Sequence, residues 1–292
     1  MKWERHVCPA AAGHIVMRGE AASYHVEAGP LVHPTTVVVC GLNRHQRAYV
    51  MDGLRRRAEC RWVDTIEELD ALLASGAAVD ALILPPDDPA GRSAVPTVER
   101  VAREWPDIAI VLFCPPRTDQ ASSLRALMLA GVHQPVFEGM HDTASAITQA
   151  VEMSRREVAG EAVYRALEPL LPDGVQTMAQ MILGRVDAMT SVEQLAHQMG
   201  VHRKTLVNRC ARAGFLQPAE LIVWCRLAMV ARMLDRTGLT VEAIGLTLNF
   251  PSHTALRNQI KRYTGRTATE LRRAGALRVV LEAMRTQGRR RH

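Results

Sequence analysis

Two short segments near the C-terminal end carry side chains that can hydrogen-bond to the edges of DNA bases. Arginine and lysine pair with O6 and N7 of guanine, and asparagine pairs with N6 and N7 of adenine. The candidate base-reading residues are Arg203, Lys204, Val207 and Asn208 in the first segment and His253, Thr254, Arg257 and Asn258 in the second. Basic residues near the ends of the same segments suit phosphates, which orient a protein without specifying sequence: Arg209, Arg212, Lys261 and Arg262. The alternative interpretation of any one of these cations is a solvated helix face.

Helical spacing separates these residues from the apolar ones beside them. Positions three and four apart share one face of a helix. In the first segment this rule places Val201, Leu206 and Cys210 inward, and in the second it places Phe250, Leu256 and Ile260 inward. The polar residues are therefore expected to point away from the core.

Each segment is the second half of a helix-turn-helix pattern, and the pattern occurs twice. The first copy is TSVEQLAHQMGVHRKTLVNRCARAG, in which Thr190 and Glu193 predict a capping box and Gly200 predicts the turn. The second is LTVEAIGLTLNFPSHTALRNQIKRYTG. Equivalent residues of the two copies are 49 positions apart before the turn and 50 positions apart after it, because the second turn has one extra residue. Asn249 stands where the first copy has glycine, and asparagine is the next most tolerant residue of a left-handed backbone.

One continuous helix is predicted between the two copies. The stretch PAELIVWCRLAMVARMLDRTG opens with Pro218 and ends with Gly238, a typical arrangement of helix boundaries. A rigid helix of this length can hold the two helix-turn-helix units at a distance near the ~34 Å repeat of B-DNA. Both units would then reach successive major grooves on one face of the duplex.

These C-terminal residues resemble the DNA-binding domain of the AraC/XylS family of bacterial transcription regulators. The resemblance covers about Gln176–Arg273 and includes RLAMVARML and IGLTLNFPSHTALRNQIKRYTGRTATELR. It implies a double helix-turn-helix fold that reads DNA. The sequence departs from the family pattern at Asn249 for glycine, Ala268 for proline, and Asn208 and Asn258 where arginine is frequent, and these departures bear on the target sequence more than on the fold.

Charge divides the chain into two unequal halves. Residues 1–150 hold 14 Lys and Arg against 18 Asp and Glu, whereas residues 201–292 hold 18 against 5. An excess of positive charge confined to one part of a chain favours a polyanionic partner for that part alone.

The region before residue 155 alternates short β-branched runs with amphipathic stretches. Strands are expected at 36–40, 61–64, 79–84, 108–113 and 134–137, and helices at 44–57, 66–74, 95–104, 122–129 and 143–154. Thr65 and Glu68 predict a capping box for the second helix. Five such units predict an α/β fold, a doubly wound parallel five-stranded sheet.

The size and order of these units resemble a response-regulator receiver domain, with DALILPPDDP as its third strand and following loop. The resemblance implies an acidic pair after the first strand and an acceptor aspartate at the end of the third. This sequence has Cys40 and Gly41 at the place of the acidic pair and Pro85 at the place of the acceptor. The family also has a hydroxyl residue after the fourth strand and a lysine after the fifth, where this sequence has Cys114 and Glu138.

Two aspartates lie just beyond the third strand. Asp87 and Asp88 are either displaced acceptors or parts of a solvated turn among prolines, and the turn is the favoured interpretation. We therefore expect a degenerate receiver that does not transfer phosphate. The crevice at the carboxyl ends of the strands is the expected place for any ligand.

Other functional classes find little support in the sequence. No apolar run reaches the ~18–20 residues of a membrane span. No apolar block follows the N-terminal basic residues, so a secretory signal is not expected. The six cysteines are scattered, which does not fit a disulfide scaffold. The first residues contain His6, Cys8, His14, His25 and His33, but their spacing fits no zinc site, so no metal and no cofactor are expected. No phosphate-binding glycine loop, nucleophile elbow or acid cluster indicates an enzyme.

The sequence thus predicts a cytoplasmic, sequence-specific DNA-binding transcription regulator, controlled through a receiver-like domain that is not phosphorylated. The expected parts are an N-terminal extension (1–34), the receiver-like domain (35–154), a linker (155–175), the DNA-binding domain (176–275) and a basic tail (276–292). Expected partners are double-stranded DNA, RNA polymerase and a second copy through the N-terminal domain, with no membrane. The alternatives are a protein-interaction adapter, a phosphorylation-responsive regulator, and an enzyme built on the sheet.

Overall fold

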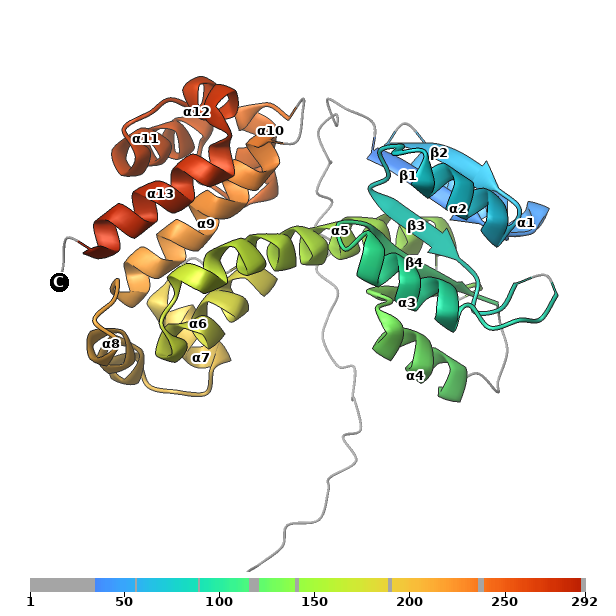
Figure 1. The fold of residues 1–292 in the computed structure, drawn as a ribbon, viewed down its shortest axis with the longest axis horizontal. Helices are drawn as coiled ribbons and strands as arrows, with labels where there is room; N and C mark the ends of the chain where they lie inside the picture. The colour runs from blue at the N-terminus through green and yellow to red at the C-terminus, as the bar shows by residue number, and fades with distance from the viewer. Residues whose placement is uncertain are drawn as a thin grey trace, which may run out of the picture.

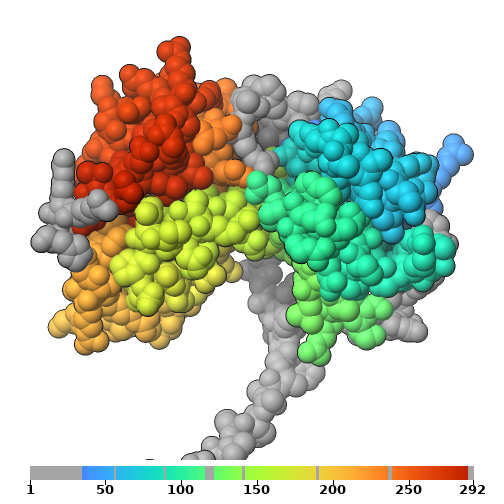
Figure 2. All heavy atoms as spheres, viewed as in Figure 1, coloured from blue at the N-terminus to red at the C-terminus, as the bar shows by residue number. Residues whose placement is uncertain are grey.

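The computed structural model of this chain describes residues 35–55, 57–88, 90–115, 121–139, 142–188, 191–235 and 239–289. The described residues form two lobes, a sheet with its flanking helices and an all-helical unit (Figures 1 and 2). One long helix takes part in both lobes.

The sheet has five parallel strands in the order β2-β1-β3-β4-β5. They are β1 (Thr35–Cys40), β2 (Ala58–Val63), β3 (Ala81–Leu84), β4 (Ala109–Cys114) and β5 (Gln134–Phe137). Every residue of β3 and β4 is buried, as strands covered on both faces must be. This strand order is that of flavodoxin and of receiver proteins, and the predicted doubly wound sheet is confirmed.

The helices cover the two faces of the sheet unequally. Helix α1 (Arg44–Leu54) lies on one face, where Val50 packs with Val37 and Val39. Helices α2 (Ile66–Ala74), α3 (Val95–Glu104) and α4 (Ala121–Ala130) lie on the other face. The predicted cap of α2 is present at Thr65, but the Glu68 carboxylate accepts from the backbone N–H of Asp64 rather than closing the box.

Helix α5 (Thr143–Leu167) is twice as long as the sequence pattern indicates. It was expected to end at residue 154 and to give way to a linker, but it continues without a break to Leu167. Its first half packs into the core of the sheet through Ile147 and Val151, and its last turns enter the helical core through Val163 and Leu167. The expected linker is therefore mostly a rigid helix shared by the two cores.

The second lobe is entirely helical. After a short 3-10 turn, η1 (Glu168–Leu170), it contains α6 (Asp173–Gly184), α7 (Val192–Gln198), α8 (Arg203–Arg212), α9 (Pro218–Asp235), α10 (Val241–Thr247), α11 (His253–Thr264), α12 (Ala268–Ala274) and α13 (Ala276–Arg289). The expected basic tail is mostly α13, which buries Ala276, Val280 and Met284 in the helical core. Arg278 and Arg285 lie on the exposed face of this amphipathic helix, and residues 290–292 lie outside the described residues.

Ion pairs also connect the lobes. The Asp107 carboxylate, just before β4, lies 2.7 Å from the Arg232 guanidinium of α9 and 3.8 Å from that of Arg165 in α5. Arg156 of α5 pairs with Asp187 after α6 at 3.2 Å. None of the helices among the described residues is long and apolar enough to cross a membrane.

Candidate nucleic-acid interface

Helix α9 forms the centre of the helical lobe. Twelve of its 18 residues are buried, so it has almost no solvent-facing side. It packs against α5, α6, α7, α8, α10, α12 and α13. At 1.5 Å per residue it is about 27 Å long. The predicted rod is thus a core element, and the helix pairs on its two ends are held by the same interior.

The first helix pair consists of α7 and α8. Helix α7 begins at Ser191, whose hydroxyl accepts from Gln194 N–H while the Gln194 side chain accepts from Ser191 N–H. The capping box therefore lies one residue beyond the predicted one, and Thr190 itself lies outside the described residues. Gly200 supplies the left-handed turn with φ 62°, and Val201 N–H closes it by donating to Ala196 at 3.0 Å.

The second pair, α10 and α11, reproduces this turn. Asn249 has φ 56°, and it is the one non-glycine residue with positive φ in the described part of the chain. Phe250 N–H donates to the carbonyl of Gly245 at 2.8 Å, as Val201 does in the first turn. Asparagine is thus in the left-handed geometry that the sequence comparison of the two copies indicates.

The residues selected from the sequence lie mainly on exposed faces. On α8 and α11 the inward set, Leu206, Cys210, Leu256 and Ile260, is buried. The residues expected to contact DNA are exposed, except half-buried Val207: Arg203, Lys204, Asn208, His253, Thr254, Arg257 and Asn258 for bases, and Arg209, Arg212, Lys261 and Arg262 for phosphates.

Helices α8 and α11 lie on the side of the helical lobe that faces away from the sheet (Figure 1). Helix α8 is joined to the start of α9 by residues 213–217, whereas α11 follows α10, and neither makes extensive contact with the strands or their flanking helices. The described part of the first lobe therefore does not cover the exposed faces of these two helices.

Two glutamates lie beside the candidate arginines; Glu193 is predicted from the sequence only as part of a helix cap, and Glu242 has no predicted role. Glu193 of α7 is 3.3 Å from Arg203, and Glu242 of α10 is 2.5 Å from Arg257. Backbone hydrogen bonding, with Arg257 and His253 nearby, lowers the pKa of Glu242. The two glutamates occupy equivalent positions, 49 residues apart, in the duplicated helices, and this equivalence is the sequence signal that could have revealed them.

A buried arginine joins the two helix pairs through the interior. Arg226 of α9 is 6% exposed and donates to the carbonyl oxygens of Val186 at 2.6 Å and Leu248 at 2.7 Å. Its guanidinium also lies 4.5 Å from the ring centre of Phe250. Val186 comes just before the first pair, whereas Leu248 and Phe250 form the turn of the second.

The environment of Arg226 carries little compensating charge. Burial lowers the pKa of its guanidinium, and the charge of Asp187 opposes that effect. Because arginine stays protonated in proteins, the two carbonyls and the half-buried Phe250 ring must hold a full cation. Phe250 is therefore a platform for this cation as well as a core residue, which corrects its expected purely inward role.

The described part of the first lobe contains neither a reactive thiol nor a cluster of metal-binding side chains. Burial raises the pKa of the Cys40 and Cys114 thiols to about 11, so both remain protonated near neutral pH. No group of three or more metal-binding side chains occurs among the described residues. The histidines and cysteine considered from the sequence, His6, Cys8, His14, His25 and His33, lie outside them.

Comparison with known proteins identifies part of the second lobe. Residues 195–274, which span α8 to α12 and part of α7, match the family described as "Helix-turn-helix domain". The C-terminal part of this chain is an AraC-type helix-turn-helix domain. The chain is similar to the HTH-type transcriptional regulator VirS of Mycobacterium tuberculosis strains CDC 1551 and H37Rv, with 30% identity over 117 residues. That match covers 40% of this chain and 34% of VirS, so this chain spans about a third of the relative's length.

Two solved structures match more of the chain at lower sequence identity. Full-length FixJ from B. japonicum is 13% identical, with a TM-score of 0.39 over 68% of this chain and 96% of FixJ. RcsB from Salmonella enterica serovar Typhimurium, bound to promoter rprA, is 12% identical, with a TM-score of 0.34 over 64% of this chain and 97% of RcsB. The strand order, not these likenesses, defines the fold of the sheet.

The buried cation generates a stability prediction. Arg226→Met should lower the free energy of unfolding by about 2–4 kcal/mol, because it leaves two buried carbonyls without donors. The matched control is Arg232→Met on the same helix, which removes a partly exposed ion pair and should cost roughly 0–1 kcal/mol. Chemical denaturation of both variants measures the difference, and equal losses would show that Arg226 is not a special contact.

Proposed function

We propose that this protein is a sequence-specific DNA-binding transcription regulator that inserts α8 and α11 into two successive major grooves. One observation carries the proposal: two basic helices, each the second of a helix-turn-helix pair, are exposed on the side of the helical lobe remote from the sheet. The similarity of residues 195–274 to helix-turn-helix domains supports it, as does the relative VirS, which is named a transcriptional regulator.

The residues divide into two roles in this proposal. Side chains in the first turns and on the outer faces of the two helices read bases, and cations near the helix ends hold phosphates. The base-reading set is Arg203, Lys204, Val207, Asn208, His253, Thr254, Arg257 and Asn258, and the phosphate set is Arg209, Arg212, Lys261 and Arg262.

The glutamate partners of Arg203 and Arg257 do not prevent this reading. The side chains of both pairs are roughly half exposed or more, and exposed ion pairs contribute about 0–1 kcal/mol. A bidentate contact between arginine and guanine is worth about 1–3 kcal/mol of base discrimination. DNA can therefore displace the glutamates, while the pairs keep both arginines oriented before binding.

Asn258→Ala tests the base-reading role. Once a preferred site has been selected from random DNA, this variant should lose about 1–3 kcal/mol of affinity for that site and almost none for random DNA. Affinity is measured by fluorescence anisotropy over a salt series, in which log K should fall linearly with log salt concentration.

Arg262→Ala is the matched control on the same helix. It should weaken both DNAs alike and reduce the salt slope by about one unit, because it removes one phosphate contact. Equal losses of Asn258→Ala on specific and random DNA would refute base reading by Asn258.

We further propose that the sheet lobe acts without phosphorylation. Cys40 and Gly41 end β1, and Pro85 follows β3, so the positions that would hold Mg²⁺ and the phosphorylated carboxylate lack acids. The Asp88 carboxylate accepts from the backbone N–H groups of Ala90 and Arg92 and from Arg92 Nε. Its oxygens are thus occupied in holding a loop.

The proposal also includes the expected partners and place of action. The partners are double-stranded DNA, RNA polymerase and a second copy joined through the first lobe, and the place of action is the cytoplasm.

Incubation with acetyl phosphate and Mg²⁺ tests this second part. Intact mass measurement should show no added phosphoryl group, and DNA affinity should not change. A receiver domain with an intact acidic pair serves as the positive control. Stable incorporation at Asp87 or Asp88 would contradict the proposal and would favour a phosphorylation-responsive regulator.

A further inference from the structure

A hollow in the described part of the sheet lobe lies where its strand order reverses. Strands β1 and β3 are neighbours, although β2 separates them in the sequence. The chain leaves β1 toward α1 on one face of the sheet and leaves β3 toward α3 on the other. Loops that diverge in this way leave a crevice at the carboxyl ends of the strands, where α/β proteins bind ligands.

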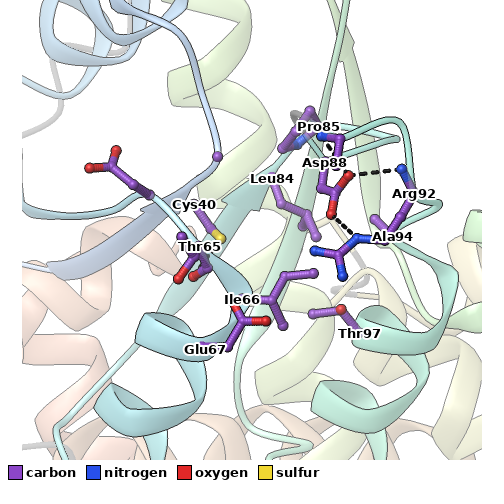
Figure 3. Close-up of a pocket in the computed structure, with 13 residues that line it drawn as sticks. Cys40, Thr65, Ile66, Glu67, Leu84, Pro85, Asp88, Arg92, Ala94 and Thr97 are labelled. Atoms are coloured by element: carbon purple, nitrogen blue, oxygen red, sulfur yellow. Dashed lines mark hydrogen bonds and ion pairs between the residues drawn. The ribbon is translucent and has the colours of Figure 1, made fainter.

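The walls of this crevice are mainly apolar. The cavity measures about 220 Å³ and is lined by Cys40 and Gly41 at the end of β1, Leu84 and Pro85 at the end of β3, the first residues of α2, and Ala94 and Thr97 at α3. Figure 3 shows Ile66, Leu84 and Thr97 directed into the same space. Since an apolar cavity of ~150 Å³ accommodates benzene, this one is large enough for a small bicyclic ring system.

One wall of the cavity is a preformed loop. The Asp88 backbone N–H donates to the Arg92 carbonyl, Gly91 N–H donates to the Asp88 carbonyl, and Ala94 N–H donates to the Pro86 carbonyl. The Asp88 carboxylate closes the same loop with the hydrogen bonds described above. A wall fixed by so many internal bonds needs little further ordering when a ligand enters.

The charges around the cavity favour a neutral ligand. Asp64 on one side pairs with Arg47, and Arg92 on the other side pairs with Asp88 at 2.6 Å. Glu67 is then the one lining charge without an ion pair among the described residues, and it disfavours an anion. Cys40 donates its S–H to the Thr65 carbonyl and stays protonated, so it serves as an uncharged wall. The Thr97 side chain is the polar group best placed to meet a single hydroxyl or N–H of the ligand.

We propose that this cavity is a binding site for a small, neutral, mostly apolar ring compound. Cys40, Gly41 and Pro85 stand where the receiver resemblance implies acids, and beside Leu84 they make this end of the sheet apolar. This inference does not depend on DNA reading by the second lobe, and either could fail alone.

Binding of 5-fluoroindole to the full-length protein, followed by fluorine NMR, tests the site. The probe signal should show saturable binding with one equivalent bound per chain. Thr97→Leu and Ala90→Phe both add bulk at the cavity, and each should weaken binding at least tenfold. Ala90 is exposed on its loop, so its variant keeps the test valid if the buried Thr97 variant does not fold.

Two controls define the outcome. Ala74→Phe adds the same ring at the exposed far end of α2 and should leave binding unchanged. Fluorinated indole-3-acetate, which adds a carboxylate, should bind at least tenfold more weakly than the neutral probe. Absence of saturable binding, equal binding by the cavity variants, or preference for the anion would overturn the proposal.

Discussion

The arrangement of the second lobe depends on one buried cation. Arg226 is inside the protein, and no carboxylate of the described residues lies within ion-pair distance of it. Its guanidinium is held by the carbonyls of Val186 and Leu248 and by the Phe250 ring. These groups come from the entrance to the first helix pair and from the turn of the second. An apolar residue could fill the same volume, but it would not fix both segments in direction, because apolar contacts are not directional. Arg226 thus connects the segment before the first helix pair with the turn of the second.

A second constraint connects this geometry to the sheet. Helix α5 begins in the core of the first lobe and ends in the core of the second, so a rotation of one lobe must bend or move the helix. At Gly160 the contact with α6 is so close that an added Cβ would lie 2.9 Å from the Leu183 carbonyl oxygen. Arg232, two turns from Arg226 on α9, reaches back to Asp107 beside β4. A displacement of the sheet therefore acts on α9 directly, through α5 and through the ion pair between Arg232 and Asp107.

Much of the architecture could be predicted because local signals and burial agree. The apolar runs at β3 and β4 are too short for membrane spans and too continuous for surface strands, so they indicate a covered parallel sheet. The duplicated turn was visible because Gly200 and Asn249 suit the same left-handed backbone. Spacing alone also separated Leu206 and Leu256 from the exposed polar residues around them.

The remaining features depend on contacts between distant segments. Gly160 and the charged residues after Ser154 suggest a linker, yet tertiary packing against α6 keeps α5 helical to Leu167. The residues of α13 look like a basic tail because only Ala276, Val279, Val280, Met284 and their neighbours on one face find an apolar partner in the core. Arg226 resembles any surface arginine in the sequence, and nothing in the chain's local pattern reveals that two carbonyls approach it from elsewhere.

The most direct test of the account is a hydroxyl-radical footprint of the full-length protein on its selected DNA site. Two helix-turn-helix units held rigidly by α9 predict two protected segments about one helical turn apart on the same face of the duplex. Insertion of five base pairs between the two segments should then abolish simultaneous protection, because it rotates one half-site to the opposite face. A single protected segment, or protection that persists after the insertion, would contradict the claim that α8 and α11 read DNA as one rigid unit.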